Sequence, residues 1–226
     1  MRVAVKLRGG GFMRDRVKTY IECFVYGDNK QLDHLEKERE ITREHRETEL
    51  MIPPDIGRQA GKLIGLLIRA TQAKRVLEFG TCLGYSTLWL AEAVRITGGR
   101  LTAIEKENCM CERTMHNLKA AGLTDYVDLI LGDAEKEIDK LNPGFDLILQ
   151  DSDKILYPVM LERTVRLLKI NGILIADDAL FKPMGMAESL SGATDLYNQL
   201  IFKDKRLYST ILPIGDGLAV SVKISD

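Results

Sequence analysis

Carboxylates follow five short apolar runs of this chain, and their positions give it its clearest capacity for chemistry. They are Glu78 after residues 75–77, Glu105 after 101–104, Asp133 after 127–132, Asp151 after 145–150, and the pair Asp177 and Asp178 after 172–176. Acids gathered on one rim repel one another, so stability alone gives little reason to keep them. We expect them to bind a cation-rich set of ligands, such as a metal ion, a positively charged cofactor and ribose hydroxyls.

The elements that must position these acids are strands and helices in alternation. Each apolar run has the length of a strand, and a helix-like segment follows it. This alternation predicts a parallel sheet with helices on both faces, whose carboxyl edge holds all five strand ends and is where such sheets bind ligands. Residues 188–203 have a helical pattern, and residues 206–212 and 218–223 form a predicted hairpin. The predicted fold is a doubly wound, Rossmann-like α/β sheet of seven strands, mostly parallel, with an antiparallel last strand.

The bulk composition is typical of a single-domain enzyme. The chain has 226 residues and a net charge of −1, so no overall field favours nucleic acid or an anionic membrane. No apolar run approaches the ~20 residues that span a bilayer, and the apolar start is too short for a signal peptide. The four cysteines, Cys23, Cys82, Cys109 and Cys111, show no disulfide framework, which predicts a cytoplasmic location.

The first 50 residues differ from the rest, and we expect them to form an extension of a core at residues 51–226. Residues 1–12 are basic and glycine-rich, which predicts disorder, whereas residues 14–50 have a very polar helical pattern. This pattern fits a helix with a solvated face, or an arm that closes over a ligand or pairs with a second subunit. In the next predicted helix, residues 56–70, the repeat of Gly57, Gly61 and Gly65 predicts close packing onto a neighbouring element.

A glycine-rich turn follows the first of the five apolar runs. Gly80 and Gly84 make a G-x-x-x-G spacing, which differs from the G-x-G-x-x-G that cradles a pyrophosphate. Glu78 stands directly before this turn, where it would repel a phosphate and attract a sulfonium or an amino-acid ammonium. Glu105 is suited to accept hydrogen bonds from ribose hydroxyls. These features, together with the hairpin, disfavour a dinucleotide-dependent oxidoreductase.

From about Met51 to its C-terminus, the chain resembles a class I S-adenosylmethionine (SAM) methyltransferase. Residues 76–81 and 84–86 look like the first SAM motif, and residues 132–134 look like the segment that touches the adenine. The closing hairpin matches the antiparallel last strand of that fold. The resemblance implies SAM contacts from Met51, Glu78, Gly80, Thr81, Gly84, Tyr85, Ser86, Glu105, Asp133, Ala134 and Asp151.

Two acidic motifs, D-x-D-K at residues 151–154 and the Asp177-Asp178 pair, carry a finer resemblance. Together with residues 212–218, they look like the metal-dependent O-methyltransferases of the catechol and caffeoyl-CoA type. The resemblance implies that Asp151, Asp177 and Asp178 hold a divalent metal, although the family usually has asparagine at the position of Asp178. Three carboxylates from two strand ends also suit a hard cation on chemical grounds, with Mg²⁺ preferred and Mn²⁺ or Ca²⁺ as alternatives.

Simpler interpretations of the same residues stay open. Asp177 and Asp178 fit a helix N-cap beside a surface acid, Asp153 fits the start of the next helix, and Lys154 fits an exposed surface lysine. Cys109 and Cys111 are only two thiols, and the three histidines are scattered along the chain. We therefore interpret these two cysteines as ordinary helix residues rather than as metal ligands.

The predicted reaction is methyl transfer from SAM to a hydroxyl of a catechol-like vicinal diol. Asp151 and Lys154 are the predicted catalytic residues, with Lys154 as general base. Residues 179–186, which include Phe181, are expected to help form the wall of an aromatic acceptor pocket. The alternative acceptor is a hydroxylated wobble uridine of tRNA, whose phosphates the basic N-terminus could meet. A SAM-binding protein without catalysis is disfavoured because the acid and lysine set is intact, and the family resemblance implies a homodimer.

Overall fold

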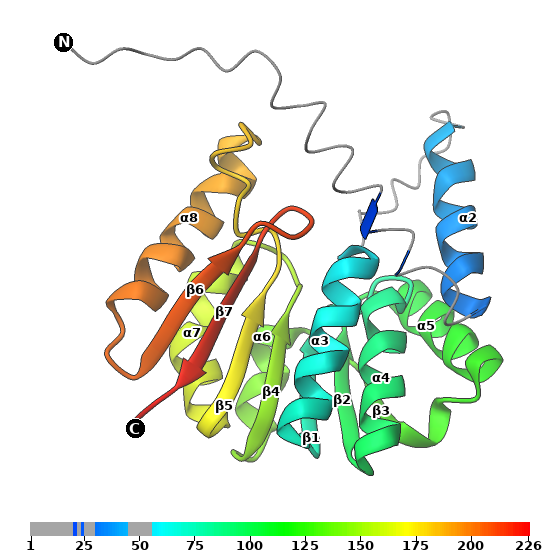
Figure 1. The fold of residues 1–226 in the computed structure, drawn as a ribbon, viewed down its shortest axis with the longest axis horizontal. Helices are drawn as coiled ribbons and strands as arrows, with labels where there is room; N and C mark the ends of the chain where they lie inside the picture. The colour runs from blue at the N-terminus through cyan, green and yellow to red at the C-terminus, as the bar shows by residue number, and fades with distance from the viewer. Residues whose placement is uncertain (1–19, 22–23, 25–29, 45–55) are drawn as a thin grey trace.

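Seven strands of the described chain form one sheet, in the order β3-β2-β1-β4-β5-β7-β6 (Figure 1). The computed structural model describes residues 20–21, 24, 30–44 and 56–226. The strands are β1 (Arg75–Phe79), β2 (Arg100–Glu105), β3 (Val127–Leu131), β4 (Phe145–Gln150), β5 (Leu168–Ala176), β6 (Leu207–Leu212) and β7 (Leu218–Lys223). The α-helices are α2 (Lys30–Glu44), α3 (Gly57–Thr71), α4 (Tyr85–Thr97), α5 (Asn108–Ala121), α6 (Ala134–Glu137), α7 (Leu156–Leu167) and α8 (Glu188–Lys203), and two 3-10 turns are η1 (Thr124–Tyr126) and η2 (Ile138–Lys140).

The direction of the strands confirms the predicted α/β architecture. Parallel pairing joins β3, β2, β1, β4 and β5, whereas β7 runs antiparallel to both β5 and β6. The order of the strands reverses between β1 and β4, which is the point where open sheets of this kind bind ligands. Because β1, β4 and β5 are neighbours, the turn after β1 lies beside the acids that follow β4 and β5.

Strand β5 is longer than the sequence predicted. It begins at Leu168 rather than at residue 172, and its pairing with β4 shifts in register, because Phe145 pairs with Leu168 whereas Leu147 pairs with Ile173. Asn171 has a φ of +66° within this irregular part of the strand. A bulge of this kind interrupts the apolar pattern on which the prediction relied.

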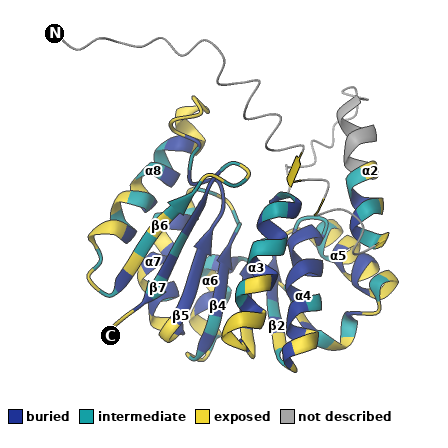
Figure 2. Cartoon of the chain, viewed as in Figure 1, coloured by how far each residue is buried: buried dark blue, intermediate teal, exposed yellow. Residues whose placement is uncertain are grey.

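The core lies on both faces of the sheet, which confirms the predicted layers. On one face the strands pack against α2, α3, α4 and α5, and on the other against α6, α7 and α8. In β5, Ile173 and Ile175 join the first face whereas Leu174 and Ala176 join the second, as the alternation of side chains along a strand requires. Figure 2 shows the central strands buried between the helices.

Helices α3 and α4 pack closely through small residues. A Cβ added at Gly61 would lie 2.4 Å from the ring of Trp89, and one at Gly65 would lie 3.9 Å from the Cβ of Ala93. The predicted packing role is therefore confirmed for Gly61 and Gly65. It is wrong for Gly57, which has nothing within 4 Å of an added Cβ and begins α3 with a φ of +71°.

The helix α2 contributes to the core despite its polar sequence. Leu32 and Leu35 are buried against the first face of the sheet, whereas Lys30, His34 and Lys37 are exposed. The interpretation of this segment as a solvated helix is thus correct only for its outer side.

Some predictions concern residues outside the described part of the chain. These are the disorder of residues 1–12, the parts of the 14–50 helix beyond α2, and the role of Met51. Within the described residues, no helix has the length and apolar character needed to cross a bilayer.

Candidate functional site

The turn between β1 and α4, residues 80–84, is shaped by two glycines. Gly80 and Gly84 have φ values of +87° and +86°, which only glycine adopts without strain. A Cβ at Gly80 would lie 2.5 Å from the backbone oxygen of Asp151, and the Asp151 amide donates to the carbonyl of Phe79 at 3.0 Å. The glycine turn is therefore in direct backbone contact with the first residue of the D-x-D-K motif.

Glu105, the last residue of β2, holds the glycine turn in place. Its Oε2 accepts hydrogen bonds from the backbone amides of Thr81 at 2.9 Å and Cys82 at 3.0 Å, and its Oε1 accepts one from the amide of Glu107 at 3.0 Å. The carboxylate is buried, with 7% of its surface exposed. Each carboxylate oxygen offers about two acceptor positions, and one donor to Oε1 is described, so Oε1 keeps capacity for a further donor such as a ribose hydroxyl. That contact stays a prediction.

Glu78 lies in β1 and is completely buried. The hydroxyl of Thr87 donates to its Oε2 at 2.7 Å. Burial raises the pKa of Glu78 to about 8, hydrogen bonds from Ser86 and Thr87 lower it in part, and the charges of Asp151 and Glu105 raise it. Without a bound cation, this carboxyl group therefore keeps its proton near neutral pH. A positively charged ligand nearby would favour the ionised carboxylate.

The remaining predicted cofactor residues also lie at the carboxyl edge. Asp133 caps α6 by accepting a hydrogen bond from the amide of Glu135 at 3.0 Å, and Ala134 beside it is buried. Ser86 and Tyr85 are buried at the start of α4, where the Tyr85 hydroxyl donates to Glu36 of α2.

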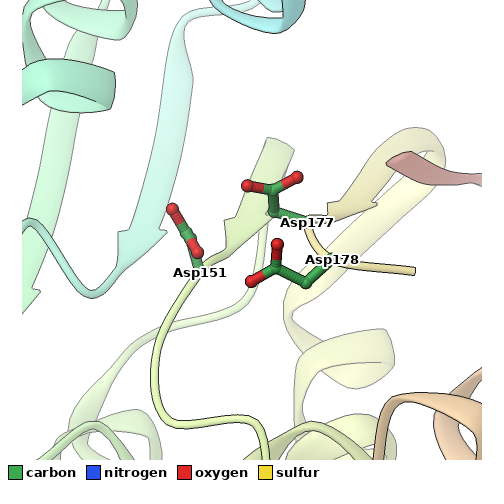
Figure 3. Close-up of side chains that lie close together, drawn as sticks. All are labelled: Asp151, Asp177 and Asp178. Atoms are coloured by element: carbon green, nitrogen blue, oxygen red, sulfur yellow. The ribbon is translucent and has the colours of Figure 1, made fainter. Parts of the chain in front are cut away.

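Asp151, Asp177 and Asp178 converge from the ends of β4 and β5 (Figure 3). One carboxylate oxygen of each lies within 4.8 Å of the others, and this is the group of possible metal ligands found among the described residues. Asp177 and Asp178 are buried, with 5% and 7% of their surfaces exposed. The predicted clustering of the three acids is thus present in the fold.

Burial and mutual repulsion act together on these acids. Burial raises the pKa of Asp177 well above its ordinary value, and the charges of Asp151 and Asp178 raise it further, while Lys154 lowers it. Burial likewise raises the pKa of Asp178, which the ammonium of Lys154 lowers. Ionising all three carboxylates is unfavourable unless a cation balances their charge. The cluster therefore suits a divalent cation.

Lys154 lies beside two acids of this cluster rather than on the surface. Its ammonium group contacts Asp178 at 2.7 Å, Asp151 at 3.0 Å and the hydroxyl of Tyr157 at 2.9 Å. Burial lowers the pKa of Lys154, but Tyr157, Asp151 and Asp178 raise it more, so the pKa lies well above its ordinary value. The interpretation of Lys154 as an exposed surface lysine is therefore wrong.

The other simple interpretations have different outcomes. The N-cap proposed for Asp177 and Asp178 is wrong, because the next helix, α8, begins only at Glu188 after its cap Ala187. Asp178 instead has a φ of +61°, a region in which asparagine and aspartate are the best tolerated residues after glycine. Asp153 is exposed, and its backbone carbonyl accepts a hydrogen bond from the amide of Leu156 at 3.0 Å, as expected for a residue that precedes α7.

The profile of the O-methyltransferase family matches residues 26–224 of the chain. The chain belongs to this O-methyltransferase family. It is 28% identical over 231 residues to a caffeoyl-CoA O-methyltransferase of Populus kitakamiensis, and the match covers 93% of this chain and 94% of that protein. It is 34% identical over 135 residues to a catechol O-methyltransferase of Mycobacterium tuberculosis, which covers 59% of this chain and 61% of that protein.

The fold of this O-methyltransferase also matches solved structures of the same kind. A methyltransferase from Podospora anserina, solved with S-adenosylhomocysteine (SAH), is 26% identical, has a TM-score of 0.78, and is matched over 99% of this chain and 100% of that chain. The protein is therefore a SAM-dependent O-methyltransferase with a Rossmann-like fold, and the oxidoreductase alternative is set aside.

Three contacts around the site of this O-methyltransferase were missed by sequence reasoning. Tyr157 supports Lys154, Thr114 on α5 donates to the carbonyl of Cys82 at 3.0 Å, and Glu36 accepts from Tyr85 at 2.6 Å. Only Tyr157 had a signal in the sequence, because it lies three residues after Lys154 and a helical turn brings such residues together.

Proposed function

We propose that this O-methyltransferase transfers the methyl group of SAM to one hydroxyl of a catechol-like vicinal diol, and that a divalent cation assists the reaction. The observation that carries the proposal is the convergence of Asp151, Asp177 and Asp178 beside the glycine turn, with Lys154 in contact with two of these acids. Relatives named for caffeoyl-CoA and catechol substrates agree with an aromatic diol acceptor.

The donor set fits a hard divalent cation. All three side chains are carboxylates, which are the ligands that Mg²⁺, Mn²⁺ and Ca²⁺ prefer, and thiols or imidazoles are absent from the group. Burial raises the pKa of both Asp177 and Asp178, and the charges of Asp151 and Asp178 raise that of Asp177 further, although Lys154 lowers both pKa values. Mg²⁺ is our first choice because its usual sites combine a few carboxylates with substrate oxygens and water.

The chemistry that a bound cation supplies is a lowered pKa for an acceptor hydroxyl. Lys154 is placed beside two of the proposed ligands, so its Nζ can take the proton of that hydroxyl as general base. The charges of Asp151 and Asp178 help to raise its pKa in the protein alone. When those charges are balanced, the pKa of Lys154 falls toward the range in which Nζ accepts a proton. The Tyr157 hydroxyl accepts a hydrogen bond from Nζ at 2.9 Å, which helps to hold Nζ in place.

The segment after Asp178 supports an apolar acceptor. Phe181 is buried at 4% exposure and stabilises the turn through its backbone, because its carbonyl accepts from the amide of Met186 at 3.1 Å. Met184 and Met186 are exposed, at 52% and 41%. We propose that the two methionines, rather than Phe181, face the aromatic ring, since methionine adapts to rings of varied shape.

The decisive experiment is SAM-dependent methylation of a catechol panel, such as 3,4-dihydroxybenzoate and caffeate, with Mg²⁺ and then with EDTA. We expect turnover that EDTA abolishes and added Mg²⁺ restores. Replacing the proposed base, Lys154→Met, should lower kcat by about 10²–10⁴-fold. Lys169→Met is the matched control, because Lys169 forms an exposed ion pair with Asp146 at 2.6 Å at the start of β5.

Turnover that EDTA leaves unchanged would contradict the proposed cation. Lack of turnover with every diol, while SAH binding is intact by calorimetry, would contradict the small-molecule acceptor and favour a macromolecular one such as tRNA. The basic residues on which that alternative rests lie within residues 1–19, outside the described part of the chain. We also propose a homodimer, which light scattering of the purified protein would test.

A further inference from the structure

Helix α2, from the N-terminal extension, reaches the glycine turn along two separate lines of contact. Its neighbours are α4, which begins directly after the turn, and α5, which supports the turn from the other side. Figure 1 shows α2 standing beside the ends of these two helices, although α2 is far from the turn in the sequence. Through such contacts, α2 can influence the shape of the predicted cofactor site.

The first line of contact runs through Glu36. Its Oε1 accepts a hydrogen bond from the hydroxyl of Tyr85 at 2.6 Å, and its carboxylate also forms an ion pair with Arg58 of α3 at 2.7 Å. The Arg58 side chain is only 6% exposed, and that of Glu36 is 21% exposed. A charged acceptor that is partly withdrawn from water makes a stronger hydrogen bond than a neutral, exposed one. Glu36 therefore fixes the orientation of the first residue of α4.

The second line of contact runs through Gln31. Its side-chain amide donates to Asn117 of α5 at 3.0 Å, and Asn117 in turn donates to the backbone carbonyl of Leu83 at 2.8 Å. Asn117 is buried, with 2% of its surface exposed. The glycine turn, residues 80–84, is thus held on its Leu83 side through α5 and on its Tyr85 side by Glu36.

We propose that Glu36 is a positioning residue for SAM binding, which acts by holding Tyr85 and thereby the end of the glycine turn. Glu36 lies on α2, which precedes the predicted cofactor motifs in the sequence. We expect Glu36 to affect the affinity for the cofactor. A turn that is already ordered loses less conformational entropy when SAM binds, so the affinity is higher.

The test is the affinity for SAH, measured by calorimetry on the full chain, in two matched variants. Glu36 and Asp33 both form ion pairs with Arg58, but only Glu36 also accepts the hydrogen bond from Tyr85. We expect Glu36→Ala to raise the Kd for SAH by about 10- to 150-fold, the range that corresponds to one hydrogen bond to a charged group. Asp33→Ala should change the Kd less than about twofold, although it weakens the attachment of α2 to Arg58.

Two further variants separate positioning from a loss of structure. Glu36→Gln keeps a neutral oxygen that accepts from Tyr85, so it should restore part of the affinity lost in Glu36→Ala. Tyr85→Phe should weaken SAH binding. Adding it to Glu36→Ala should give no further loss, since each change removes the same hydrogen bond, the one between Tyr85 and Glu36. Circular dichroism melting of each variant shows whether the fold is kept.

Equal weakening by Asp33→Ala and Glu36→Ala would overturn the proposal, because it would assign the effect to the docking of α2 as a whole. An unchanged Kd in Glu36→Ala, or additive losses in the double variant, would overturn it as well. The measurement needs no acceptor, so its outcome is independent of the proposed diol substrate.

Discussion

The backbone of Asp151 touches Gly80 so closely that position 80 has no room for a side chain. A Cβ there would lie 2.5 Å from the carbonyl oxygen of Asp151. This contact joins the turn expected to hold SAM to the first of the acids proposed to hold the cation. The distance between the two halves of the site is therefore set by main-chain packing.

Gly80→Ala is expected to weaken SAH binding severely and to destabilise the fold. The left-handed backbone costs about 1–2 kcal/mol for alanine, and the contact with Asp151 adds to that cost. Gly122→Ala is the matched control, because Gly122 has a φ of +68° but nothing within 4 Å of an added Cβ. It should lower Tm and leave the Kd for SAH unchanged. Similar Kd values for the two variants would contradict the importance of this contact.

Asp178→Asn is expected to keep the fold and the activity. Asparagine tolerates the left-handed backbone at position 178, where φ is +61°, and offers an oxygen to a cation. Because one negative charge is lost, the Mg²⁺ concentration that gives half-maximal turnover should rise. Asp151→Ala or Asp177→Ala should instead lower turnover by at least about a hundredfold, as expected when a site loses a ligand. Complete inactivity of a folded Asp178→Asn variant would argue against the proposed ligand set.

The buried carboxyl of Glu78 predicts that the stability of the SAM-free protein falls with rising pH. Burial raises its pKa from an ordinary value of 4.5 to about 8, so between these two values the folded state holds a proton that the unfolded state has lost. Stability from this group is therefore fully present below pH 4.5 and is lost as the pH rises through 8. The size of the effect is of the order of several kcal/mol.

Glu78→Gln tests this pH dependence, because glutamine resembles the protonated acid but cannot lose a charge. The variant should gain Tm relative to the unmodified protein as the pH rises from 5 to 8, by about 2–4 °C for each kcal/mol. Glu162→Gln provides a comparison at a carboxylate whose pKa is lowered by its hydrogen bond with Arg206. Parallel Tm curves for Glu78→Gln and the unmodified protein would show that Glu78 is charged in the folded state.

Gly61 and Gly65 predict opposite effects of the same substitution within one helix. Gly61→Ala would place a methyl group 2.4 Å from the ring of Trp89, and we expect a loss of about 1–3 kcal/mol from overpacking. Gly65→Ala meets only the Cβ of Ala93 at 3.9 Å and should gain up to about 1 kcal/mol from the better helix propensity of alanine. Urea denaturation of both variants measures the difference. A stabilised Gly61→Ala variant would show that α3 and α4 separate readily.

Much of the fold was predictable because local patterns determine it. The five apolar runs that end in acids correspond to β1 through β5, and each terminal acid lies at the carboxyl edge. The start of β5 was placed too late, because its bulge near Asn171 breaks the apolar pattern. The core contribution of α2 was also missed, since Leu32 and Leu35 are isolated apolar residues in a strongly polar segment.

The acid cluster was predictable in membership but not in its contacts. Strand ends and the family resemblance predict that Asp151, Asp177 and Asp178 lie together, as they do in the fold. The contact of Lys154 with Asp151 joins residues three positions apart, whereas its contact with Asp178 joins residues 24 positions apart and depends on the tertiary fold. The bond between Glu36 and Tyr85 joins residues 49 positions apart, and only the tertiary fold reveals it.

The turn after Asp178 combines a firmly attached backbone with exposed side chains. The amides of Ala179 and Leu180 donate to the carbonyls of Gly217 and Asp216 at 2.9 Å, whereas Met184 and Met186 project outward. Mutations at the two methionines therefore change the chemistry of the surface without altering the main chain that carries the acids. During evolution, the residue types at these two positions can change while the methyl-transfer chemistry stays the same. They are the natural place to begin a saturation library for enzymes with a new acceptor range.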